Sequence, residues 1–272
     1  MLNQYLGVSI SKELEKFSHI EEIRIRLNRP VCIQDMTGLY KTDIITDKRE
    51  IERIFSSLCN FSVYARQQEI KNGFITLPEG HRVGICGRCI LENKKMINIS
   101  GITSLNIRIS REVKNCALPI YNNIRNNIDH TVIISPPNCG KTTYLRDLTR
   151  LFSNDGINIS VVDERGEIAP LSEEINFDLG LNTDVLQFCP KYIGMIMVLR
   201  TMNPKIIVTD EIGSFKDGEA LTEMTKSGVV TFTSFHGNDL NDFKRRFKHY
   251  SVFKYAVILN NRKEVDKILC LR

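Results

Sequence analysis

Residues 131 to 143 constrain the fold of this chain more than any other segment. TVIIS at 131–135 is apolar enough for a buried strand, PPNCG follows as a loop, and the residues from 141 onward have the character of a helix. A loop in this position directs its backbone N–H groups inward, and the helix N-terminus adds positive potential. The segment therefore predicts a phosphate-binding site at the edge of an α/β sheet.

The loop residues carry the chemistry of nucleotide binding. In the pattern G-x-x-x-x-G-K-[ST], the lysine reaches the β and γ phosphates and the hydroxyl binds Mg²⁺, and Lys141 and Thr142 fit these roles. Ser135 stands in the first glycine position, where a small residue can still serve. We expect the ATP cradle to comprise Ser135, Pro136, Pro137, Asn138, Cys139, Gly140, Lys141, Thr142 and Thr143.

A second apolar strand, KIIVTDE at 205–211, ends in two acids about 70 residues after Lys141. Asp210 would hold Mg²⁺ through water, and Glu211 would polarise the attacking water as a general base. Surface acids often follow a strand, so this segment alone would be weak evidence. Its place on a parallel strand after the phosphate loop favours a catalytic pair.

Two further strands end in polar residues. INISVVDERGE at 157–167 places Asp163, Glu164 and Glu167 at the carboxyl edge, where open α/β sheets bind ligands. VVTFTSFHGN ends with Thr233 and His236, and this histidine could contact the γ-phosphate or the attacking water. A lone histidine is more often an ordinary surface or core residue. The expected catalytic residues are Glu211, Lys141, His236 and Glu164.

Several arginines could neutralise charge in a transition state, and a finger from a neighbouring subunit can raise the rate by orders of magnitude. Each is more commonly a surface cation, and the sequence does not choose among them. The candidates are Arg82, Arg88, Arg108, Arg111, Arg165 and Arg200.

The chain has two styles of sequence. Residues 20–33 alternate like strands broken by Asn-Arg-Pro, residues 48–73 have helical spacing, and further strands follow to about residue 110. From 131 onward, apolar strands alternate with helices, including one around 187–202, which predicts a mostly parallel sheet covered on both faces. We expect an α/β fold with an N-terminal domain at 1–118 and a larger domain at 119–272.

Composition sets weaker limits. A net charge of +5 with a pI near 8.7 permits an anionic partner but does not require one. The start has no signal-peptide character and no apolar run reaches the ~18 residues of a membrane span, so a cytoplasmic location is expected. Cys86 and Cys89 form a CxxC pair without a second pair, which we interpret as inert thiols.

The chain resembles the stage III sporulation protein AA family over nearly its whole length. The resemblance is carried in the second half by SPPNCGKTTYLRDLTRLFS, VVDERGEIAP, LRTMNPKIIVTDEIG and VVTFTSFHG, and in the first half by EIRIRLNRPV, QQEIKNGFITLPEGHRVGICGR and ISGITSLNIRISREV. The resemblance implies a RecA-like P-loop NTPase core and a hexameric ring that hydrolyses ATP with Mg²⁺ between subunits. It also implies a motor for the sporulation channel between mother cell and forespore. Such a motor would dock from the mother-cell cytoplasm on a membrane-embedded channel component.

That family is related to the ATPases of type II and type IV secretion, whose four boxes would fall here at 135–143, 163–167, 210–211 and 233–236. Two departures stand out. Asn138 replaces an expected glycine, although asparagine tolerates positive φ better than most residues. The segment at 171–180 is shorter or less regular than usual for the family.

Two other functions remain open from the sequence. A nucleic-acid-binding ATPase would need basic residues interleaved with exposed aromatics, for which KRRFKHY at 244–250 is the best candidate, although it equally fits a solvated helix face. Nucleic acid is therefore the less favoured partner. A scaffold that binds nucleotide without turnover is disfavoured by the presence of Glu211.

Overall fold

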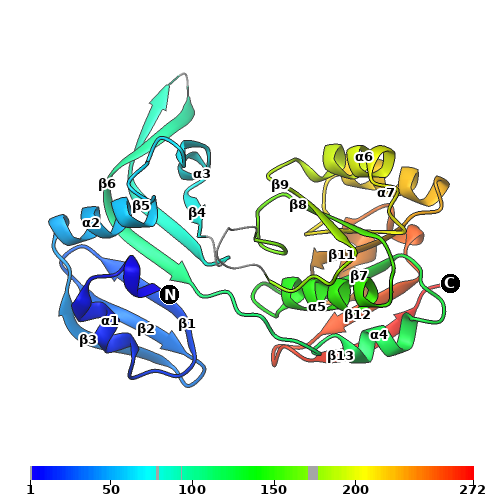
Figure 1. Ribbon diagram of the computed structural model, residues 1–272, viewed down its shortest axis with the longest axis horizontal. Coiled ribbons are helices and arrows are strands. Elements are labelled where there is room, and N and C mark those ends of the chain that lie inside the picture. The colour runs from blue at the N-terminus through cyan, green and yellow to red at the C-terminus, as the bar shows by residue number, and fades with distance from the viewer. Residues whose placement is uncertain (1, 78–79, 93, 171–176) are drawn as a thin grey trace. The chain divides into compact units, whose positions relative to one another are not determined.

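The computed structural model describes residues 2–77, 80–92, 94–170 and 177–272, so part of the irregular segment at 171–180 lies outside the described residues. The chain divides into two compact units, Met1–Ser110 and Arg111–Arg272 (Figure 1). This division falls earlier than the boundary after residue 118 that the sequence suggested.

The first unit is built on a six-stranded sheet in which every neighbouring pair is antiparallel, in the order β3-β2-β1-β6-β5-β4. The predicted break of the 20–33 region into two strands is confirmed, with Asn28 at a positive φ of 54° in the turn. The strands are β1 (Ile20–Arg26), β2 (Pro30–Asp35), β3 (Leu39–Ile45), β4 (Phe74–Thr76), β5 (Arg82–Glu92) and β6 (Lys95–Arg108).

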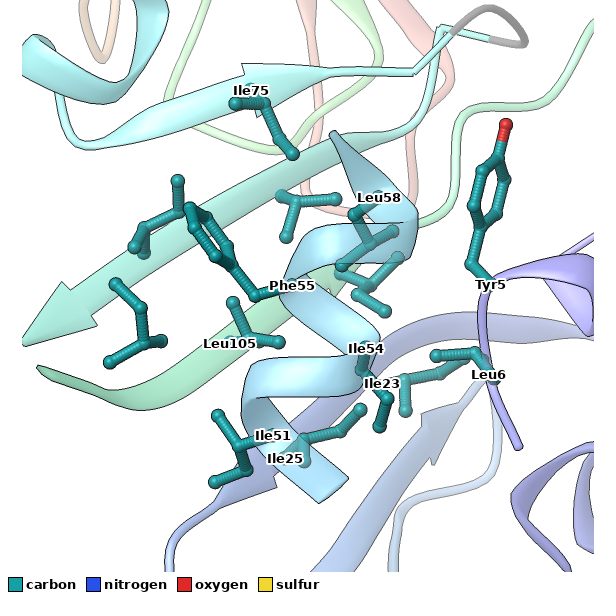
Figure 2. Packing of buried hydrophobic residues seen from close by; sticks show 14 of the residues in the cluster. Tyr5, Leu6, Ile23, Ile25, Ile51, Ile54, Phe55, Leu58, Ile75 and Leu105 are labelled. Atoms are coloured by element: carbon teal, nitrogen blue, oxygen red, sulfur yellow. The ribbon is translucent and has the colours of Figure 1, made fainter. Parts of the chain in front are cut away.

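Helix α2 (Lys48–Leu58) contributes one apolar face to the core of this unit. Asp47 caps its N-terminus by accepting a hydrogen bond from the Glu50 backbone N–H at 2.8 Å. Apolar residues recur at helical spacing, so one face packs on the sheet (Figure 2). That face consists of Ile51, Ile54, Phe55 and Leu58. The helices of the unit are η1 (Leu2–Gln4), α1 (Val8–Leu14), α2 (Lys48–Leu58) and α3 (Gln67–Lys71).

The helical pattern expected from 48 to 73 is interrupted in the structure. Residues 59–66 separate α2 from α3, and Asn60 and Phe61 both have positive φ, at 49° and 56°. A positive φ cannot continue a right-handed helix, so the chain turns there.

The second unit contains a seven-stranded sheet in the order β13-β12-β7-β11-β10-β8-β9. All neighbouring pairs are parallel except β12 with β13, which form the hairpin predicted at the chain end. The mostly parallel sheet is as predicted. The strands are β7 (Thr131–Ser135), β8 (Ile159–Asp163), β9 (Thr183–Gln187), β10 (Ile206–Thr209), β11 (Val230–His236), β12 (Tyr255–Leu259) and β13 (Val265–Cys270).

Helices cover both faces of this sheet because alternate strand residues point to opposite sides. Figure 1 shows α4 and α5 on one face of the sheet and α6 and α7 on the other. Ile133 packs with α4 and α5 in one core, whereas Val132 and Ile134 pack with α6, α7 and α8 in the other. The helices are α4 (Leu118–Ile124), α5 (Lys141–Asn154), α6 (Lys191–Thr201), α7 (Phe215–Lys226), α8 (Leu240–Arg246) and η2 (Tyr250–Val252). Strand β9 was not predicted, and the helix expected around 187 begins at Lys191.

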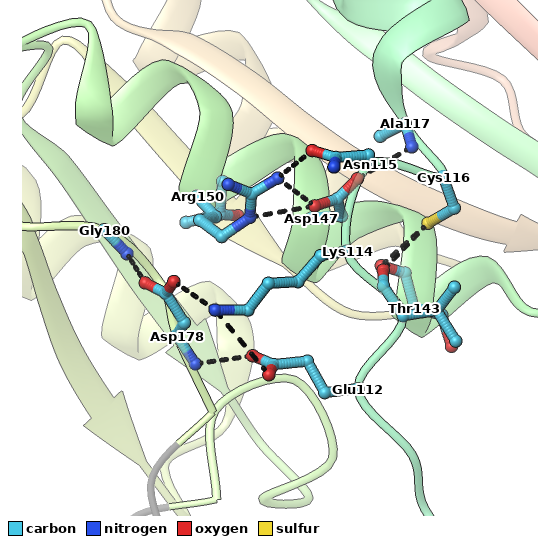
Figure 3. A network of polar contacts seen from close by, with 12 residues as sticks. Glu112, Lys114, Asn115, Cys116, Ala117, Thr143, Asp147, Arg150, Asp178 and Gly180 are labelled. Atoms are coloured by element: carbon cyan, nitrogen blue, oxygen red, sulfur yellow. Dashed lines mark hydrogen bonds and ion pairs between the residues drawn. The ribbon is translucent and has the colours of Figure 1, made fainter.

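A polar network joins residues 112–117 to helix α5 (Figure 3). Asp147 accepts a hydrogen bond from the Ala117 N–H at 2.8 Å and is bound by Arg150 at 2.7 Å. Lys114 pairs with Asp178 at 2.7 Å. These contacts explain why the segment before α4 belongs to the second unit.

The sheet order brings the ends of four strands together. His236 of β11 lies opposite Ser135 of β7, and Thr209 of β10 lies opposite Val162 of β8. Because neighbouring parallel strands end on the same side, the residues that follow them gather at one edge.

Candidate functional site

The loop after β7 has the backbone geometry of an anion-binding turn. Asn138 has a φ of 62° and Gly140 a φ of 85°, both in the left-handed region. Asparagine and glycine are the residues that adopt this region with least strain. Asn138 thus accommodates the positive φ, as anticipated from its residue type. Helix α5 begins at Lys141, so its N-terminus opens onto the loop.

Lys141 is enclosed by the loop that precedes it. Its Nζ donates to the carbonyl oxygens of Ser135 at 3.0 Å and Pro136 at 2.9 Å. Burial lowers the pKa of the lysine to about 8, while Glu211 acts in the opposite direction. The ammonium group is therefore held inside the turn, within electrostatic reach of the acid after β10.

The side chains of Glu211 and His236 are in close contact at this edge of the sheet. The distance from Nδ1 of His236 to Oε1 of Glu211 is 2.8 Å. Burial lowers the pKa of His236, and the nearby Lys141 lowers it further. Both effects favour the neutral ring, against the opposing effect of Glu211. The sequence suggested that this histidine could contact the γ-phosphate or the attacking water, and the structure adds its contact with Glu211.

Asp210 is a buried carboxylate with few partners. Burial raises its pKa to about 7, against the opposing effect of Lys191. Among the described residues, its Oδ1 has no hydrogen-bond partner, and the Lys191 Nζ lies 3.4 Å away. A bound cation can replace the missing hydrogen-bond donor of such a buried oxygen.

Asp163 differs from the acids that follow it, because its carboxylate is bound to backbone N–H groups. Its two carboxylate oxygens accept hydrogen bonds from the backbone N–H groups of Glu167, Ile168 and Ala169 at 2.8–3.0 Å. Its side chain therefore shapes the turn after β8, which we call the acid loop (residues 164–169). The sequence had grouped Asp163 with Glu164 and Glu167, and the structure separates it from them.

Arg146 of α5 holds the acid loop from the other side. Its Nε donates to the carbonyl of Ile168 and its Nη2 to that of Glu167, both at 2.7 Å. Burial lowers the pKa of Arg146 to about 10. The helix that follows the phosphate loop thus binds the acid loop directly. Sequence reasoning missed this arginine, because its burial becomes visible only in the folded chain.

Lys191, which the sequence analysis also missed, links two of the predicted acids. Its Nζ lies 2.5 Å from Oε2 of Glu164 and 3.4 Å from Oδ1 of Asp210. One signal was available, since a lysine in the first turn of a helix is opposed by the helix dipole and needs a reason to be there.

The structure sorts the arginine candidates. Arg165 lies 3.9 Å from Glu211. The backbone carbonyl of Arg111 accepts a hydrogen bond from Arg146 at 3.2 Å. Arg200 is exposed on α6. Within the first unit, Arg82 stacks on Phe74 at 3.9 Å, Arg108 lies 3.8 Å from Glu22, and Arg88 is exposed on β5.

The basic cluster at 244–250 does not form the stripe expected for nucleic acid. Phe247 is buried in the core beside Phe243 and Phe253, with only 2% of its surface exposed. Phe247 therefore cannot stack on bases, and the partly buried Tyr250 is the remaining phenyl ring of the cluster.

The fit to Mg²⁺ can be judged from these residues. Within the described part of the chain, no group of three or more histidine, cysteine, aspartate or glutamate side chains could hold a metal ion. Mg²⁺ in nucleotide sites takes one or two protein oxygens, with phosphates and water as the other ligands. The buried Asp210, whose Oδ1 has no hydrogen-bond partner among the described residues, fits that mode. Over the described residues, we also find no helix with the length and apolarity needed to traverse a bilayer.

The strand order, with β7 between β12 and β11 and the phosphate loop at its end, defines a RecA-like P-loop fold. Solved structures share it. The ATPase DotB of Legionella pneumophila aligns with a TM-score of 0.68 and 14% identity over 99% of this chain and 82% of its own. The pilus retraction motor PilT with bound ADP aligns with a TM-score of 0.62 and 11% identity over 93% and 77%. At these identities, the likeness concerns the fold alone.

The chain belongs to the family described as sporulation stage III, protein AA, whose sequence pattern matches residues 1–271. It is 40% identical over 240 residues to the stage III sporulation protein AA of Bacillus subtilis (strain 168). That match covers 85% of this chain and 78% of the relative. The resemblance inferred from the sequence is confirmed.

Proposed function

We propose that this chain is a Mg²⁺-dependent ATPase that converts ATP and water to ADP and phosphate. The observation that carries the proposal is the close contact between His236 and Glu211, with 2.8 Å from Nδ1 to Oε1, at the same sheet edge as the enclosed Lys141. A carboxylate that contacts a histidine and lies near a phosphate-loop lysine suits a general base for an attacking water.

Each residue has a distinct part in this proposal. The loop at 135–143 and the α5 N-terminus bind the phosphates, and Lys141 exchanges its carbonyl partners for phosphate oxygens. The Thr142 hydroxyl would bind Mg²⁺ and Asp210 would hold the ion through water, and the ion would supply charge neutralisation when bound. Glu211 accepts the proton of water, and His236 keeps the Glu211 carboxylate in position. Glu164 lies in the acid loop and contributes a further carboxylate at this edge of the sheet, where it pairs with Lys191.

We further propose that the ATPase works as the motor of the sporulation channel between mother cell and forespore. Membership of the sporulation family and the fold shared with DotB and PilT support this role. It would act as a homo-oligomer, a hexameric ring with hydrolysis at subunit interfaces. It would sit on the mother-cell side, bound peripherally to a membrane-embedded component of the channel.

The test compares nucleotide binding with hydrolysis in purified protein. Lys141→Ala should abolish binding of a fluorescent ATP analogue. Glu211→Gln should bind normally and hydrolyse ATP more slowly by about a hundredfold or more, the scale of losing a general base. The matched control is Glu219→Gln, which changes an exposed glutamate on α7. If Glu211→Gln hydrolysed ATP at the wild-type rate, Glu211 would not be the general base.

The same assay separates the other functions. Tight binding without phosphate release by the wild type would favour a nucleotide-binding scaffold. Stimulation by single-stranded DNA or RNA, with none by fragments of a membrane partner, would favour a nucleic-acid ATPase. The burial of Phe247 argues against that second outcome. The oligomeric mass measured with ATP bound tests the ring.

A further inference from the structure

Helix α6 approaches strand β8 unusually closely, and Gly194 makes this possible. A Cβ atom on Gly194 would lie 2.5 Å from Cγ1 of Val162 and 3.2 Å from Cδ2 of Leu186. Real Cβ atoms do not approach neighbours to 2.5 Å, so only glycine fits without a shift. The close approach brings the first residue of α6, Lys191, to the carboxyl end of β8.

At that position the Lys191 side chain is 11% exposed and lies between two carboxylates. Its Nζ is 2.5 Å from Oε2 of Glu164 and 3.4 Å from Oδ1 of Asp210. The two acids come from neighbouring strands, since Val162 of β8 lies opposite Thr209 of β10. One ammonium group thus connects the acid loop to the strand that carries the candidate Mg²⁺ ligand.

This position is electrostatically unfavourable for the lysine alone. The first turn of a helix carries partial positive charge, which repels a cation. Two nearby carboxylates outweigh that repulsion, because an ion pair with little solvent exposure is screened far less than a surface pair. Without Lys191, Glu164 and Asp210 would lose the cation that contacts them both, and their like charges would repel each other.

We propose that Lys191 is a positioning residue for the metal site. It fixes the Asp210 carboxylate and the Glu164 side chain in one arrangement, so that Asp210 is ready to take Mg²⁺ together with the nucleotide. The inference rests on the proposed function and adds to it a residue outside the four boxes. Its role differs from simple structural support, because it concerns the contribution of Mg²⁺ rather than the grip on phosphate.

The first experiment measures binding of a fluorescent ATP analogue to the full chain, with Mg²⁺ or with EDTA. Lys191→Met keeps the length of the side chain and removes its charge. It should reduce the gain in affinity from Mg²⁺ by about tenfold, the scale of losing a partner that orients a metal ligand, while affinity in EDTA changes little. Lys191→Arg should retain most of the gain. An unchanged gain in Lys191→Met, or an equal loss with and without Mg²⁺, would overturn the proposal.

A second measurement does not depend on nucleotide. Amide hydrogen exchange of residues 164–169 in the nucleotide-free chain should be faster in Lys191→Met than in the wild type. The control is Lys226→Met, which should leave this exchange unchanged. Lys226 is an exposed lysine of α7 that forms an ion pair with Glu223 of the same helix. If the wild type bound no nucleotide, the proposed function would fail while the exchange data still decided the role of Lys191. Equal exchange in Lys191→Met and wild type would refute it.

Discussion

At the scale of single residues, His130 shows how burial changes a titratable group. Its Nδ1 accepts a hydrogen bond from the Thr231 N–H at 3.1 Å, and its Nε2 lies 3.2 Å from Oγ1 of Thr225. Burial lowers its pKa to about 4. His81 in the first unit is similar, with its pKa lowered by burial to about 4 and its Nδ1 bonded to the Ser110 N–H. Both rings are neutral acceptors in the folded chain.

These two histidines predict loss of stability in mild acid. Their pKa is about 4 when folded and near 6.5 when unfolded, so the unfolded chain binds more protons between those values. Stability therefore rises with pH across this window and is lost as pH falls from about 6.5 towards 4. Each ring contributes at most about 3 kcal/mol to this change in the free energy of unfolding. Asp210, whose pKa is raised, acts in the opposite direction.

A variant isolates the effect of one histidine. Urea unfolding of His130→Gln should show a smaller loss of unfolding free energy between about pH 7 and pH 5 than the wild type, since the unfolded histidine no longer takes a proton. His19→Gln, at an exposed position in the first unit, should keep the wild-type pH dependence. Equal pH dependence for all three proteins would show that His130 is not responsible.

At the scale of elements, helix α6 depends on its closeness to β8. Its sequence, KYIGMIMVLRT, is apolar on most sides, and Gly194 is the residue at which the helix backbone approaches Val162 of the strand. The fully buried Val162 is β-branched and stiff, so it cannot move aside easily. The spacing between helix and strand is thus determined by one glycine.

Gly194→Ala should destabilise the protein by about 1–3 kcal/mol, the range for overpacking a core. It should also weaken the contribution of Mg²⁺ to nucleotide affinity, because α6 would carry Lys191 away from Glu164 and Asp210. Chemical denaturation and the binding assay measure the two effects. Gly213→Ala is the matched control, since no atom lies within 4 Å of its added Cβ. A Gly194→Ala protein as stable as the wild type would contradict the packing argument.

At the scale of the whole molecule, the two units have separate hydrophobic cores. The core of the first unit draws its buried residues from Tyr5 to Ile107, and both cores of the second draw theirs from Ala117 to Leu259. The phosphate loop, the acid loop, Lys191 and the acids after β10 all belong to the second unit. A complete core and a complete set of these residues therefore lie within 111–272.

We expect residues 111–272, produced alone, to unfold cooperatively and to bind ATP through the same loop. Retaining residues 111–117 matters, because Asp147 and Arg150 bind this segment to α5. A fragment that starts at residue 119 should be less stable, since it lacks those contacts. Calorimetry and fluorescent-nucleotide binding compare the two fragments. Equal stability of both would contradict the role given to the network in Figure 3.

Much of the second unit was predictable because its signals are local. The apolar strands, the glycine before Lys141 and the acids after 209 are patterns of neighbouring residues, and parallel strands must end at one edge. Strand β9 escaped prediction because TDVLQ is short and only partly buried. The helix expected through 48–73 was wrong at 59–66, where the backbone conformation breaks a regular apolar pattern.

By itself, the sequence determined the phosphate loop, the mostly parallel sheet and the family, because each depends on residue types at fixed spacing. Only the tertiary structure decided which acids have a free oxygen and which are occupied. Asp163 and Asp210 both end buried strands, yet Asp163 is held by three backbone N–H groups, while Asp210 faces Lys191. The difference arises because burial and hydrogen-bond partners are set by segments far apart along the chain, which no local pattern describes.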